Sequence, residues 1–141
     1  MGGEKVMNEF LNSWSPRILS VLRIITGFLF LWHGSQKLFD FPHSEMPMGG
    51  GAFIIFAGIL EFFGGILILI GLFTRWTAFI LSGMMAVAYF MGHAFNGKGF
   101  LPIQNGGNGG ELAIIYCFVF FYFFFAGGGP WSLDSLLKKN A

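Results

Sequence analysis

The chain has 141 residues, of which 55% are hydrophobic and only 11% charged, and its formal net charge is +1. Soluble domains carry about 25% charged residues, so this composition predicts an integral membrane protein and excludes a domain whose whole surface is exposed to water. The near-neutral charge gives no basis for binding nucleic acid. Because Cys117 is the only cysteine, a disulfide or a dithiol redox pair within the chain is also excluded.

The N-terminal segment, residues 3–13, predicts a short amphipathic helix lying in the membrane interface. Its apolar side chains recur at helical spacing opposite the charges and continue into Trp14. Ser15 and Pro16 follow, and these residue types favour the N-cap and the first turn of a helix. We therefore predict that a separate membrane-spanning helix begins at this point.

Four apolar segments predict membrane-spanning helices. Their predicted bounds are 16–39, 52–73, 75–95 and 111–127. At 1.5 Å per residue the first three cover a hydrocarbon core about 30 Å thick, whereas the fourth is shorter and is expected to recruit residues after Gly127. The predicted fold class is an all-α membrane protein, a four-transmembrane-helix bundle in one membrane domain over residues 1–141, with residues 128–141 as a short tail.

The basic residues predict the orientation, because cytoplasmic loops are enriched in Lys and Arg. One side holds Lys5, Arg17, Arg75, Lys138 and Lys139, and the other holds Lys37 and Lys98. The count predicts that both termini and the tail are cytoplasmic, with the protein in the inner (cytoplasmic) membrane of a cell.

Glu61 lies in the middle of the segment 52–73, where a charge costs about 2.5–3.5 kcal/mol on insertion scales. Its side chain is too short to reach the membrane surface, and the glycines around it indicate a face turned toward other helices. Two interpretations stay open. Glu61 is either a clamp between helices, paired or protonated, or a proton carrier and ligand contact in a cavity.

The first span carries Arg23, Gly27, Gly34 and Lys37 along one stripe, which is typical of a helix face packed against a neighbour. Arg23 and Lys37 are also close enough to the span ends to reach lipid headgroups, so that alternative stays open. His33 lies near the outer end of the same helix, about 80° around from the stripe by helix geometry.

Polar side chains from all four spans and the second outer loop gather in the outer half of the predicted bundle. They are His33, Lys37, Glu61, His93, Asn105, Asn108 and Glu111. We predict that Glu61 exchanges a proton there, and that ligand contacts come from Arg23, His33, Lys37, His93, Asn108 and Glu111. No HxxE or HxxxH spacing accompanies the histidines, so haem is disfavoured and no metal site is predicted.

The order of several motifs resembles the DoxX family of small membrane proteins. They are Leu22-Arg23 with Gly27 and Gly34 to Lys37, then Glu61 with Gly64-Gly65, Gly71-Leu72, Thr74-Arg75, Asn108 to Glu111, Tyr116, Gly127, Gly129 and Ser132 to Asp134. The resemblance implies a four-helix protein associated with redox membrane complexes, with a quinone as the candidate ligand. It also implies that Arg23, Lys37, Glu61, Arg75 and Glu111 matter together, and that Ser132 to Asp134 caps a short helix.

Two functions follow as hypotheses. The first is a subunit of a redox membrane complex that binds a quinone or similar ligand, with the electron carrier on a partner subunit. The alternative is a non-catalytic assembly subunit of a larger membrane complex. Both have the lipid bilayer and membrane-protein subunits as partners. Because the chain has no cofactor motif, a self-sufficient enzyme is the weaker hypothesis, and whether the chain catalyses anything stays open.

Overall fold

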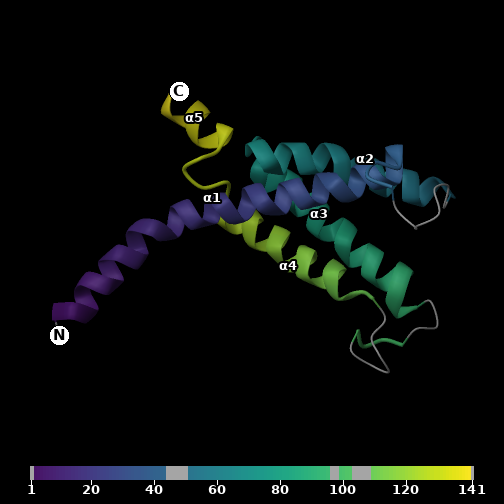
Figure 1. Cartoon of the computed structure of the whole chain (residues 1–141), viewed down its shortest axis with the longest axis horizontal. Helices are drawn as coiled ribbons and strands as arrows, with labels where there is room; N and C mark the ends of the chain where they lie inside the picture. Colours follow the sequence, from purple (N-terminus) through teal and green to yellow (C-terminus); the bar gives the residue numbers. More distant parts are fainter. Residues whose placement is uncertain (1, 44–50, 96–98, 103–108, 141) are drawn as a thin grey trace.

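The computed structural model describes residues 2–43, 51–95, 99–102 and 109–140, and within them the protein is built from helices (Figure 1). The helices are α1 (Gly2–Phe39), α2 (Gly51–Ile70), α3 (Thr74–Tyr89), α4 (Glu111–Ala126) and α5 (Leu133–Lys139), with the π-helical turn η1 (Phe90–Ala94) continuing α3. Helices α1, α2 and α3 with η1 are long and apolar enough to cross a membrane, and α4 is a shorter apolar helix. The predicted all-α class is confirmed. Helices α2, α3 with η1, and α4 lie close to the predicted bounds, whereas α1 begins well before the predicted start at residue 16.

The predicted break at Ser15 and Pro16 is wrong, because α1 runs without interruption through Pro16. A proline inside a helix removes one hydrogen bond and bends the helix, and Figure 1 shows this part of α1 curving away from the other helices. Residues 2–18 are all exposed, so solvent or headgroups can satisfy the carbonyl that Pro16 leaves unpaired. The amphipathic segment 3–13 is therefore the first part of α1 rather than a separate helix.

Glycines allow α1 and α2 to pack backbone against backbone. A Cβ on Gly27 would lie 2.5 Å from the Leu69 nitrogen, and one on Gly65 would lie 2.5 Å from the Leu31 nitrogen. A Cβ on Gly34 would overlap the backbone of α2 in the same way. The predicted close approach along the stripe of the first span is confirmed, and it brings α1 side chains onto α2.

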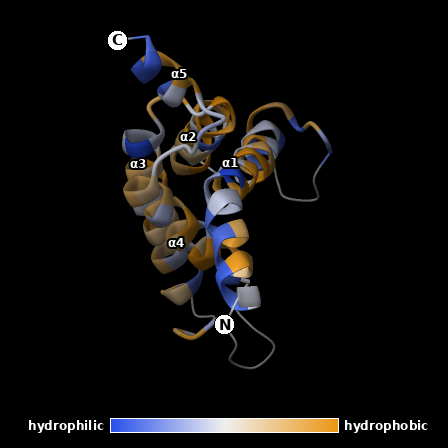
Figure 2. Cartoon of the chain, turned by 90° about the vertical axis from the view of Figure 1, so that its left-hand side faces the viewer, coloured by the Kyte–Doolittle hydropathy of each residue, from blue (hydrophilic) through white to orange (hydrophobic). Residues whose placement is uncertain are grey.

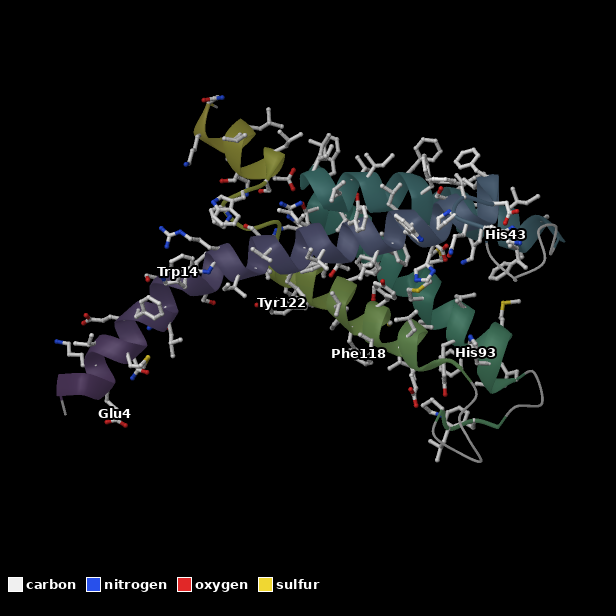
Figure 3. The ribbon with its side chains drawn as sticks, viewed as in Figure 1. Glu4, Trp14, His43, His93, Phe118 and Tyr122 are labelled. Atoms are coloured by element: carbon white, nitrogen blue, oxygen red, sulfur yellow. The ribbon has the colours of Figure 1, made fainter. Side chains whose placement is uncertain are left out.

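The core lies where the four long helices meet, and much of the outer surface remains apolar. Phe30 of α1 packs on Tyr116 and Phe120 of α4, with ring centroids 5.2 and 4.7 Å apart. Figure 2 shows hydrophobic colours over much of α2 and α4 and hydrophilic ones gathered near the start of α1 and in α5. Phe118 and Tyr122 of α4 are more than half exposed (Figure 3), as expected of side chains that contact lipid.

Two ends of the protein are distinguished below. The α5 end contains the turn between α2 and α3 together with α5, and the Phe39 end contains the last residue of α1 and the first turn of α2. Both chain termini lie toward the α5 end of the long axis (Figure 1).

Candidate functional site

Glu61 is buried on the face of α2 that packs against α1, with only 3% of it exposed. The glycines Gly58 and Gly64 on either side of it are also buried, Gly58 against α1 and Gly64 against Leu81 of α3. A Cβ on Gly58 would lie 3.0 Å from the Lys37 Cβ, so this glycine leaves room for the lysine stem. The sequence thus provides a small-residue surface that lets a lysine reach a carboxylate at membrane depth.

Lys37 forms an ion pair with Glu61, in which Nζ donates to Oε1. The lysine side chain is 27% exposed and the glutamate 3%, so the pair reaches from the protein interior toward the surface. The other carboxylate oxygen of Glu61, Oε2, is buried and has no hydrogen-bond partner among the described residues. An unpaired buried acceptor costs about 1–3 kcal/mol, which makes this atom the most notable polar group in the membrane-embedded part.

His33 and Tyr116 lie next to this pair. His33 is one helical turn before Lys37 on α1, and its ring is nearly perpendicular to that of Tyr116, with centroids 6.3 Å apart. Tyr116 is buried on α4, and its ring also packs on Phe30 of α1. The structure therefore brings together a carboxylate, an ammonium, an imidazole and a phenol from three helices, and we call these four residues the Glu61 cluster.

Arg23 lies in a different place, fourteen residues before Lys37 and thus about 21 Å away along α1. Its guanidinium is fully buried and donates to four backbone carbonyls. The acceptors are the oxygens of Gly128 at 2.8 Å, Ile68 and Leu69 at 2.5 Å, and Trp131 at 2.6 Å. The side chain ties α1 to the end of α2 and to the segment after α4, and it does not reach lipid headgroups.

The remaining predicted residues lie toward the ends of α3 and α4. His93, in η1, is partly buried and is labelled in Figure 3. Its ring stacks on that of Tyr89, with centroids 6.4 Å apart. A Cβ on Gly109 would lie 3.7 Å from this imidazole, which places His93 beside the chain entering α4. Glu111 is the first residue of α4, as predicted, and is exposed. Asn108 and Asn105 lie outside the described residues.

Metal coordination finds no support in the part of the chain that the structure describes. No three His, Cys, Asp or Glu side chains come together there in a group that could hold an ion. The chemistry that the Glu61 cluster offers is hydrogen bonding and proton exchange, because it combines a buried acceptor with donors on the neighbouring helices.

Sequence reasoning missed the role of Asp134. Ser132 caps α5 as expected, since its hydroxyl accepts from the Ser135 nitrogen at 3.2 Å. Asp134 instead crosses to α3, where its two oxygens accept from the Phe73 and Thr74 nitrogens, each at 2.8 Å. The signal available in the sequence was that Phe73, at the N-cap of α3, has no side chain able to accept these bonds.

Comparison with known proteins identifies the family. The DoxX family model matches residues 18–94, which is more than half of the chain. The chain belongs to the DoxX family. A protein of Haemophilus influenzae described as uncharacterized is 45% identical over 130 residues, covering 89% of this chain and 94% of that protein. A second uncharacterized protein of Haemophilus influenzae is 29% identical over 114 residues, covering 77% and 71%.

No solved structure matches the chain. The family match confirms the resemblance noted from the motifs, and with the apolar helices it makes this a multi-pass membrane protein. The matched region contains Arg23, His33, Lys37 and Glu61, whereas Tyr116 follows it. The roles of these residues in ligand binding stay predictions.

Proposed function

We propose that this DoxX-family protein is a membrane subunit that binds a quinone or similar lipophilic, hydrogen-bonding ligand at the Glu61 cluster. A partner subunit of a redox complex would supply two electrons when a quinone is reduced and accept two electrons when a quinol is oxidised. The observation that carries the proposal is Glu61 Oε2, a buried carboxylate oxygen with no hydrogen-bond partner among the described residues. Its neighbour Oε1 is already held by Lys37, so a ligand hydroxyl would complete the pairing without breaking the ion pair.

Each member of the cluster has a distinct part in this proposal. Glu61 accepts a hydrogen bond from a quinol hydroxyl and takes its proton when the quinol is oxidised, or returns one when a quinone is reduced. Lys37 stabilises the ionised carboxylate, and its partly exposed side chain connects the pair to the surface. The rings of His33 and Tyr116, which stand nearly perpendicular to each other, supply aromatic surface and further polar atoms for a ligand.

The orientation belongs to the proposal as well. The excess of Lys and Arg at the α5 end supports a cytoplasmic location for both termini in an inner membrane. The Glu61 cluster would then lie in the outer half of that membrane.

The proposal is tested by native mass spectrometry of the full chain, extracted gently from its own membrane. Under reducing conditions the wild-type protein should carry a quinol. Glu61→Gln should lose at least ten-fold in quinol occupancy, because Lys37 engages the amide oxygen and the remaining NH2 cannot accept the hydrogen bond of the quinol hydroxyl. Glu9→Gln, on the exposed part of α1, is the matched control and should keep the quinol. Equal quinol occupancy in the two variants, or none in the wild type, would refute the proposal.

A second candidate is a non-catalytic assembly subunit of a larger membrane complex. This alternative is favoured because both cations of the α1 stripe bind groups of the protein itself: Lys37 binds Glu61, and Arg23 binds four carbonyls. Under this alternative, gentle extraction yields a larger particle with no small molecule on this chain. Glu61→Gln then lowers the yield of that particle rather than any turnover rate.

A further inference from the structure

A separate pocket of about 600 Å³ lies at the α5 end, between the start of α3, the end of α4 and α5. Its lining includes Thr74, Arg75, Trp76, Asp134, Lys138 and Lys139. Because α2 and α4 end here and α3 begins here, the pocket lies at the level where the apolar helices leave the bilayer. Trp76 is 70% exposed, and an exposed tryptophan at such a level is typical of the headgroup region.

The pocket carries a net positive charge. Arg75, Lys138 and Lys139 supply three cations, and Asp134 is the one acidic residue in the described lining. Both oxygens of Asp134 are already engaged by backbone N–H groups at the start of α3. An anionic ligand that enters the pocket therefore meets an excess of positive charge, while the carboxylate of Asp134 is held in place by its own hydrogen bonds.

Arg75 presents a free edge of its guanidinium to this pocket. Its Nη1 donates to the carbonyls of Phe124 at 2.8 Å and Phe125 at 2.6 Å, which fixes the group against the end of α4. Its Nε and Nη2 have no hydrogen-bond partner among the described residues. They lie 3.6 and 3.4 Å from where a Cβ on Gly127 would stand, so the glycine leaves this edge open. Two parallel N–H groups of this kind match two oxygens of a phosphate.

Thr74 adds an independent sign of a missing partner. The residue is fully buried in the wall of the pocket, and its Oγ1 has no hydrogen-bond partner among the described residues. A buried hydroxyl is normally paired, so an oxygen-rich ligand in the pocket would supply what the protein does not.

We infer that this pocket binds the phosphate of an anionic phospholipid from the adjacent leaflet. The apolar surroundings favour a lipid over a soluble phosphate, because Leu133, Leu136 and Leu137 of α5 are exposed beside the cations. Acyl chains can follow that apolar surface while the headgroup sits among the basic side chains. The site is distinct from the Glu61 cluster and does not depend on the ligand proposed there.

The test adds dioleoyl phosphatidylglycerol or dioleoyl phosphatidylcholine to the full chain in detergent. Native mass spectrometry then measures how tightly each lipid binds. The wild type should bind the anionic lipid about ten-fold more tightly. The double variant Lys138→Gln/Lys139→Gln should bind phosphatidylglycerol more weakly, by about five-fold per lysine, as expected for basic residues near an anionic lipid surface. The side chain of neither lysine makes a hydrogen bond to another described residue, so the fold should be preserved, and Lys5→Gln in α1 is the matched control.

Arg75→Gln provides the second variant and should abolish the preference for phosphatidylglycerol. Equal binding of the two lipids by the wild type would overturn the inference, as would a double-lysine variant that binds phosphatidylglycerol like Lys5→Gln. Glycerol phosphate serves as the soluble competitor. If it displaces phosphatidylglycerol at comparable concentration, the pocket is a soluble-anion site and the lipid assignment is wrong.

Discussion

Replacing Arg23 by methionine should destabilise the protein strongly without altering its apolar exterior. The guanidinium donates to the carbonyls of Gly128, Ile68, Leu69 and Trp131. A hydrogen bond to a charged group contributes about 1.5–3 kcal/mol, so four would sum to about 6–12 kcal/mol. Bonds made by one group are not independent, and the substitution also removes the cost of burying a cation. We therefore expect a loss of about 3–5 kcal/mol, below that sum, because the four carbonyls are left unpaired but no charge remains buried.

The assay can use the protein's own reporter. Cys117 is the only cysteine and lies half-buried on α4, so a thiol-reactive fluorophore reports unfolding as the mixture is heated. For Arg23→Met we expect the midpoint to fall by about 10 °C or more. Arg17→Met is the matched control, because Arg17 is exposed on the same helix and contacts only its own first turns, the Ser13 carbonyl and the Trp14 ring. If the two variants melt at the same temperature, Arg23 is not a clamp and the reasoning fails.

Three further substitutions test the packing of the buried polar and glycine positions, all with the same melting assay. Lys37→Met should lower the free energy of unfolding by about 3–5 kcal/mol, because it leaves a buried carboxylate unpaired. Adding Glu61→Gln to this variant should restore much of that stability. If the losses of the two substitutions simply add, the ion pair is contradicted. Gly65→Ala should lower the melting midpoint by forcing α1 and α2 apart. Gly83→Ala is the control and should leave the midpoint unchanged or raise it, because a Cβ there meets nothing within 4 Å. A lower midpoint for Gly83→Ala than for Gly65→Ala would refute the packing. Asp134→Ala should cost about 1–2 kcal/mol through loss of the cap on α3, and an unchanged midpoint would count against that cap.

Hydrophobic segments and glycine spacing predicted the helices well, because in a bilayer the backbone must satisfy its own hydrogen bonds. Pro16 was misplaced as a helix start, since local preferences cannot show whether the chain continues straight through a proline. The sequence indicated that Glu61 needed a partner, but its pairing with Lys37 depends on the register of α1 against α2. Asp134 was missed for the same reason, because it caps a helix sixty residues away in the chain.

The two buried charged groups, Arg23 and Glu61, differ in whether they can bind a ligand, and this difference indicates where a site can lie. Arg23 has four of its N–H groups bound to carbonyls of neighbouring segments, so a ligand could reach it only by displacing bonds that hold helices together. Glu61 has one oxygen held and the other unpaired, so a ligand could bind there with the ion pair intact. Substituting Arg23 should therefore reduce ligand occupancy only in proportion to unfolded protein. Substituting Glu61 should reduce occupancy in protein that is still folded, and measuring both quantities on one sample separates the two effects.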